Sequence, residues 1–234
     1  MAEVMLEVCV DSAAGLAAAL QGGAGRIELC AALELGGLSP SPGLMRLAAG
    51  APVPVYAMIR PRPGDFVFSA DDLAVMQGDI AAVRRAGLAG VVLGASLASG
   101  ALDAAMLARL VALSAGLGMT LHRAFELVPD RAAALELAIE LGFERILTSG
   151  GAAAAPQGVA ALRLDFQQAA GRIGIMPGAG VTAASVGALR GLPLREVHAS
   201  CSGAVARADR FQLGGARETS VALVRDLVAV LKEW

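Results

Sequence analysis

GGAGRIELC, residues 22–30, joins a glycine-rich turn to a short apolar strand that ends in cysteine. The same pattern returns at three further places, in AGLAGVVLG (86–94), LGFERILTSG (141–150) and GLPLREVHAS (191–200). Each copy follows a stretch rich in Ala and Leu at helical spacing. Glycine suits the end of such a helix because it accepts a positive φ at low cost. A helix that leads through a turn into a buried strand is the repeating unit of a parallel α/β fold.

Extending the pattern along the chain predicts eight strands, which start near Leu6, Arg26, Val53, Gly90, Met119, Arg145, Arg172 and Glu196. Helix starts are predicted at Asp11 and Ser12, Ser41 and Pro42, Asp71, Asp103, Asp130 and Thr182, each of which precedes an apolar periodic run. Residues 152–158 and 203–215 are predicted to be loops, and the second precedes a last helix over about 220–233. An open doubly wound sheet is the alternative fold. Eight units close a barrel, so we predict an α/β, single-domain (β/α)8 TIM barrel over residues 1–234.

The composition excludes several classes of protein. Hydrophobic residues make up 56% of the 234 residues and charged residues 17%, which excludes a disordered chain. Aromatic residues are only 3%, the net charge is −2 and no basic stripe stands out, so we expect neither a nucleic-acid nor a membrane partner. The acidic N-terminus MAEVMLEVCV is unlike a signal peptide. We therefore read the three cysteines as reduced thiols and expect a cytoplasmic protein.

Side-chain alternation predicts which residues point into the barrel. Helices cover the outer face of each strand, so the apolar alternate set should face outward and the polar set inward. In the first strand Leu6, Val8 and Val10 form the apolar set, which leaves Glu7 and Cys9 inside. The same argument turns Arg26 and Glu196 inward, and it gives the set of inward ionisable residues as Glu7, Glu28, Arg60, His122 and His198.

These inward residues have two interpretations. As an active site, they offer His122 or Glu28 as general base, Arg60 to hold a substrate anion, and His198 as a further catalytic candidate. As a structural feature, Glu7, Glu28 and Arg60 would form an ion-pair layer inside the barrel. The sequence leaves it open whether the protein is an enzyme.

Two cysteines occupy similar places in neighbouring strands. Cys9 and Cys30 each follow a glutamate by two residues. Adjacent strands lie about 4.8 Å apart, and two thiolates at that separation suit a soft ion such as Cu(I). The alternative is that both are small buried residues that only pack. Cys201 follows the eighth strand and is interpreted as incidental.

Glycine-rich and polar turns follow the later strands. The pattern Pro177-Gly178-Ala179-Gly180 ends the seventh strand, and a helix is expected from Thr182. Barrels often bind phosphate at this place through backbone N–H groups and a helix N-terminus. The candidate residues for binding an anion are Arg62, Ser149, Gly178, Gly180 and Ser200. The alternative is that the glycines only form tight turns.

At these same residues the chain resembles the CutC family. The resemblance rests on LEVCVDS (6–12), GRIELCAALELGGLSPSPG (25–43), MIRPRPGDFVFS (58–69), TLHRAFE (120–126), FERILTSGG (143–151), IMPGAGV (175–181) and EVHAS (196–200). It implies a TIM barrel that is cytoplasmic and homo-oligomeric, as a dimer or tetramer, and associated with copper homeostasis. It also implies Cys9 and Cys30 as the Cu(I) ligands. The family brings no established enzyme activity. One departure is Pro63, where other members have glycine before GDF.

Three functions remain open from the sequence. The first is a copper-binding protein with Cys9 and Cys30 as thiolate ligands. The second is an enzyme that acts on a small anionic, for example phosphorylated, metabolite at the C-terminal mouth of the barrel. The third is a scaffold whose barrel mouth is vestigial.

Overall fold

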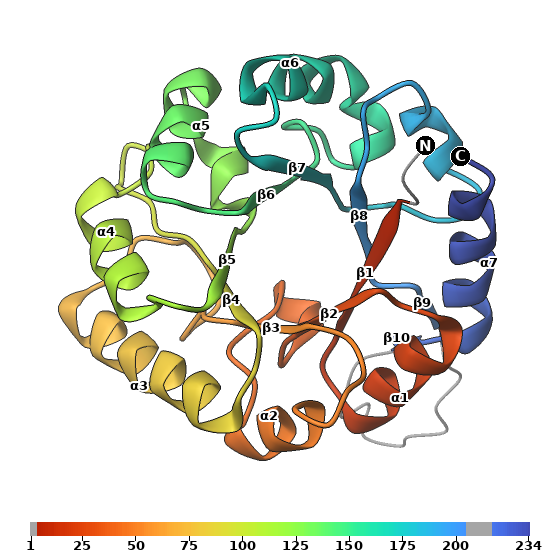
Figure 1. The fold of residues 1–234 in the computed structure, drawn as a ribbon. Helices are drawn as coiled ribbons and strands as arrows, with labels where there is room; N and C mark the ends of the chain where they lie inside the picture. The colour runs from red at the N-terminus through yellow and green to blue at the C-terminus, as the bar shows by residue number, and fades with distance from the viewer. Residues whose placement is uncertain (1–3, 205–216) are drawn as a thin grey trace.

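The computed structural model describes residues 4–204 and 217–234 and shows a ring of eight strands surrounded by helices (Figure 1). All eight strands are parallel and pair in the order β7-β6-β5-β4-β3-β2-β1-β8. β7 and β8 are in contact, so the ring nearly closes. The predicted TIM barrel is therefore confirmed.

The observed bounds agree closely with the predicted strand starts. The barrel strands are β1 Met5–Val10, β2 Arg26–Leu29, β3 Val55–Met58, β4 Gly90–Leu93, β5 Gly118–Leu121, β6 Arg145–Thr148, β7 Gly174–Pro177 and β8 Glu196–Ala199. The α-helices of the described residues are α1 Ala13–Gly22, α2 Pro42–Ala48, α3 Ala70–Ala86, α4 Ala104–Leu113, α5 Arg131–Glu140, α6 Val159–Ala169 and α7 Val221–Lys232. A two-stranded ribbon, β9 Ser202–Ala204 and β10 Arg217–Thr219, lies before α7. Short 3-10 turns complete the connections, at η1 Leu33–Leu35, η2 Arg123–Leu127, η3 Ala155–Gln157 and η4 Val186–Leu189.

Side-chain caps fix where most helices begin. Ser12, Ser41, Asp103 and Asp130 accept hydrogen bonds from the first helical turn, as the sequence predicts. α3 begins two residues earlier than expected, because Ser69 and not Asp71 is its N-cap. The loop predicted for 203–215 is partly strand β9, and its residues 205–215 lie outside the described residues.

The helix predicted from Thr182 is wrong. This connection contains only the four-residue turn η4 among its helical elements. The hydroxyls of Thr182 and Ser185 instead accept hydrogen bonds from each other's backbone N–H groups, at 3.2 and 3.0 Å. These reciprocal bonds have the pattern of a capping box and start a turn, in which the Val186 N–H donates to Thr182 O at 2.9 Å. The turn ends in the 3-10 segment η4, which contains the poor helix former Gly187. The connection therefore has no long helix whose N-terminus could face the barrel mouth.

The barrel interior contains a charged layer at its N-terminal end. Arg26 pairs with Glu7 and with Glu196, the second at 2.6 Å. Arg145 also pairs with Glu196, at 3.2 Å, and the ring of Tyr56 lies against both arginines. A structural ion-pair layer thus exists, but Arg26, Glu196 and Arg145 complete it in place of the expected Glu28 and Arg60. No helix in the described parts of the chain is long and apolar enough to cross a bilayer.

Candidate functional site

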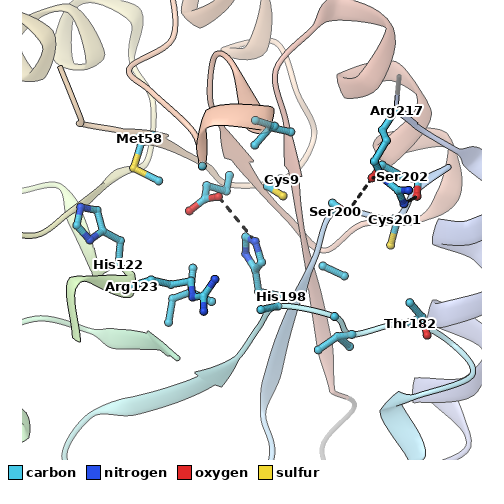
Figure 2. Close-up of a pocket in the computed structure, with 18 of the residues that line it drawn as sticks. Cys9, Met58, His122, Arg123, Thr182, His198, Ser200, Cys201, Ser202 and Arg217 are labelled. Carbon is cyan, nitrogen blue, oxygen red and sulfur yellow. Dashed lines mark hydrogen bonds and ion pairs between the residues drawn. The ribbon is translucent and has the colours of Figure 1, made fainter. Parts of the chain in front are cut away.

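A cavity of about 470 Å³ opens at the C-terminal ends of the strands. Seven of the residues predicted from the sequence line it, namely Cys9, Glu28, Arg60, His122, Gly180, His198 and Ser200. Figure 2 shows Cys9 and His198 near the centre, with Met58 and His122 on one side and Ser200 and Cys201 on the other. The reactive side chains are therefore gathered at the end of the barrel where such folds carry their sites.

Three of these residues converge at one wall. A ligand atom of Cys9, one of Glu28 and one of His198 all lie within 4.8 Å of one another, and all three side chains are buried. The strands β8, β1 and β2 are neighbours, and the register places Cys9 opposite Glu28 and Glu7 opposite His198. A thiol, a carboxylate and an imidazole in such a cluster are suited to hold a metal ion.

Glu7 fixes the orientation of the His198 ring. Its Oε1 lies 2.8 Å from His198 Nδ1, which leaves Nε2 on the side of Glu28, at 3.8 Å from its Oε2. Burial opposes the ionisation of Glu7, but His198 and Arg26 outweigh it and lower the pKa of Glu7 to about 2. Burial likewise opposes the charge on His198, but Cys9, Glu28 and Glu7 raise its pKa well above the usual value. Glu7 is thus an anion that holds the His198 ring in place through Nδ1, the nitrogen on the side away from Glu28.

Cys30 lies outside this convergence. The register pairs Cys9 with Glu28, so Cys30 is two residues further along its strand than the position opposite Cys9. This differs from the equivalent placement expected from the sequence. The Cys30 thiol is fully buried and donates a hydrogen bond to Glu28 Oε2 at 3.6 Å. Burial, with the charge of Glu28, raises the pKa of Cys30 well above its usual value, so it remains a thiol.

A second wall of the cavity is formed by His122 and its neighbours. His122 Nδ1 accepts a hydrogen bond from the backbone N–H of Ala124 at 3.1 Å. Burial and the charge of Arg60 lower the pKa of His122 to about 3, so the ring is neutral and its proton is on Nε2. This Nε2 is buried and has no hydrogen-bond partner within the described residues. Gly94 makes room for the ring, because a Cβ there would lie 2.5 Å from His122 Nδ1.

Arg60 lies in the same wall and has unusual partners. Its Nη1 donates to Leu35 O and Gly37 O, and its Nη2 donates to Gly64 O at 2.7 Å. Across residues 4–204 and 217–234, no carboxylate forms an ion pair with this guanidinium, and its buried Nε has no partner. Arg60 as a whole residue is only 5% exposed to solvent. The ring of Phe66 packs against both side chains, with its centroid 4.9 Å from the guanidinium carbon of Arg60 and 4.6 Å from the centroid of the His122 ring.

Three other predicted residues do not line the cavity. Arg62 is half-exposed and pairs with Asp65 and Asp72. The Ser149 hydroxyl lies 2.6 Å from Ala152 O, and is therefore engaged within its own turn. A Cβ at Gly178 would lie 2.5 Å from Leu147, so this glycine permits close packing inside the barrel.

Sequence reasoning missed several lining residues. Arg123 and Phe66 both line the cavity. They stand in the motifs HRAF and GDF of the family resemblance, and these motifs could have indicated them as site residues. Cys201, interpreted from the sequence as incidental, also lines it. Burial raises the pKa of Cys201 to about 12, which keeps it protonated. The role of Glu7 beneath His198 depends on register between distant strands, and no local pattern reveals it.

Comparison with known proteins gives a consistent assignment. The model of the CutC family matches residues 4–203. A CutC family protein of Rhizobium meliloti is 62% identical over 205 residues, which cover 87% of this chain and 84% of the relative. One from Caulobacter vibrioides is 55% identical and covers 98% of this chain and 97% of the relative. A solved structure from Streptococcus agalactiae, described as CutC and connected by name with copper homeostasis, superposes with a TM-score of 0.80 at 28% identity, over 84% of this chain and 98% of that one. The chain therefore belongs to the CutC family.

Proposed function

We propose that this protein binds Cu(I) through the Cys9 thiolate and the His198 imidazole, with the Glu28 carboxylate as a third donor. The observation that carries the proposal is the convergence of these three groups within 4.8 Å in a buried cavity. Thiolate is a preferred ligand of Cu(I), and imidazole also suits copper. The copper homeostasis in the name of the Streptococcus agalactiae relative agrees with this choice of ion.

The surroundings of His198 support a metal ligand at this position. Histidines that bind metals usually donate their second ring N–H to a carboxylate, which fixes the tautomer and aims the free nitrogen. Glu7 provides that carboxylate at 2.8 Å from Nδ1. On the other side, Glu28 Oε1 is buried without a partner in the described chain, so a cation there would relieve an unfavourable burial.

The proposed ligand set differs from the two-cysteine site expected from the sequence. Cys30 is a thiol that donates a hydrogen bond to Glu28 and does not line the cavity. We therefore assign it to the support of Glu28. The difference is testable, because the two ligand sets predict opposite behaviour for a serine at position 30.

The experiment is an anaerobic Cu(I) titration in competition with a chromophoric Cu(I) chelator. Wild type should bind one equivalent, and Cys9→Ser and His198→Gln should each lose stoichiometric binding. Cys30→Ser and Cys201→Ser are the matched controls and should retain it. Circular dichroism of each variant establishes that it is folded.

Two results would overturn the proposal. Equal losses in Cys9→Ser and Cys30→Ser would favour a pair of thiolates in place of the mixed site. A parallel titration with Zn(II) covers the other ion that accepts Cys, His and Glu ligands. Stoichiometric Zn(II) binding without Cu(I) binding would retain the site and refute copper.

A further inference from the structure

We infer that the same cavity holds a second site, for a small organic carboxylate, between Arg60 Nε and His122 Nε2. Neither donor of this site is a proposed metal ligand, so its binding can be tested on metal-free protein whatever the result with copper. Its evidence is a pair of unsatisfied donors in one wall, a buried charge without a counter-ion, and a small apolar space beside them.

The first step is the uncompensated charge of Arg60. Three backbone carbonyls satisfy its Nη atoms but bring no negative charge, and in the described structure no ion pair reaches it. Burying an unpaired charge is unfavourable, and buried charges are normally paired. The three carbonyls use three of its five N–H groups, and the buried Nε–H has no partner within the described residues, so it remains for a ligand. A bound anion would supply both the missing charge and the missing acceptor.

The second step is the polarity of His122. Because Nδ1 accepts from Ala124, the neutral ring presents Nε2–H and can only donate there. Arginine has no acceptor either. The atoms that meet these two groups must therefore be acceptors, which excludes an amine or another cation from this wall. An oxyanion can accept one hydrogen bond at each of two oxygens, one from Arg60 Nε–H and one from His122 Nε2–H.

The third step separates a carboxylate from a phosphate. Arg60 is one cation facing a site that also contains the Glu28 carboxylate, so a monoanion is compensated and a phosphate dianion is not. The other basic residues of the cavity already have partners: His198 lies 2.8 Å from Glu7, Arg123 pairs with Glu126 at 3.8 Å, and Arg217 donates to Ser202. The phosphate site expected after the seventh strand also lacks its helix, since only η4 is present.

The fourth step is the shape of the remainder of the ligand. Phe66, Met58, Leu33 and Leu147 line the cavity and provide apolar surface beside the donors. A volume of about 470 Å³ is within the range of small-molecule pockets. The carboxylate thus belongs to a short carbon chain or a single ring.

The experiment is calorimetric titration of metal-free protein, treated with a chelator, with butyrate and benzoate. The matching amides, butyramide and benzamide, test the need for charge, and inorganic phosphate tests the other oxyanion. We expect at least one carboxylate to bind, and neither amide nor phosphate to match it. His122→Leu and Arg60→Lys should each weaken binding by on the order of tenfold or more, the usual effect of losing a hydrogen bond to a charged group.

Controls keep the result interpretable. Arg62→Gln changes the neighbouring arginine outside the cavity and should bind as wild type does. Because Arg60 also holds loop carbonyls, His122→Leu is the primary variant, and its thermal unfolding is checked first.

Several outcomes would overturn the inference. These are equal binding of amide and carboxylate, phosphate binding that exceeds that of both carboxylates, unchanged affinity in folded His122→Leu, and no binding of either carboxylate at millimolar concentration. Difference density in a crystal soaked with the bound carboxylate should lie between the two nitrogens. Density elsewhere in the cavity would equally contradict the assignment.

Discussion

Replacing Glu7 by glutamine removes one charge from the centre of the barrel while keeping the shape of the side chain. Glu7 is fully buried between Arg26 and His198, and its pKa is about 2 in place of the usual 4.5. A drop of this size corresponds to about 3 kcal/mol of folding free energy. That agrees with the roughly 3–5 kcal/mol lost when a buried ion pair is broken from one side. We expect Glu7→Gln to lower the free energy of unfolding by about 3 kcal/mol at pH 7.

The pH dependence has a definite sign. Because the folded-state pKa is depressed, the contribution of Glu7 is complete above the unfolded pKa of 4.5 and is lost as the pH falls toward 2. Urea unfolding of wild type and variant, followed by far-UV circular dichroism, should therefore show a gap that narrows below pH 4.5. Glu136→Gln is the control, since its ion pair with Arg172 is exposed and screened by solvent, and it should lose much less stability. The reasoning is refuted if the two variants lose equal stability at pH 7, or if the gap for Glu7 stays constant with pH.

Three further predictions concern single positions. Gly94→Ala should displace the His122 ring and lower stability by about 1–3 kcal/mol, measured by thermal unfolding, because its Cβ would overlap the imidazole; an unchanged midpoint would contradict the close contact. Ser69→Ala should cost about 1 kcal/mol in urea unfolding, because it removes the capping box with Asp72 at the start of α3, and a loss near zero would contradict that role. Cys30 should resist iodoacetamide in the native protein at pH 8 and react after denaturation, as measured by peptide mass spectrometry, because burial and Glu28 keep it protonated; rapid native modification would show that it is accessible.

Alternation along the strands was enough to predict most of the interior. A period of two and an outer layer of helices decide which side chains turn inward, and Cys9, Glu28, Arg60, His122 and His198 do line the cavity. Strand starts were also predictable, because a glycine turn marks the entrance of several strands. Both signals are local and depend on a few consecutive residues.

Register between strands was not predictable from the same patterns. Cys9 and Cys30 look equivalent when each strand is read alone, yet the stagger of the barrel places Cys9 opposite Glu28. The partners of Arg26 and Arg60 could not be predicted for the same reason. Both arginines point inward, but one meets two carboxylates and the other meets only carbonyl groups. Such differences arise from residues far apart in the sequence.

The charged layer of Arg26, Glu196 and Arg145 fills one end of the barrel with ion-paired side chains, of which Arg26 and Glu196 are buried. Ligands would therefore enter and leave the cavity through the same opening, at the C-terminal ends of the strands. An ion at Cys9 and His198 and an organic anion at Arg60 and His122 would share that opening. The order of binding would then affect the rates, because the ligand bound nearer the opening would block the entry and release of the other.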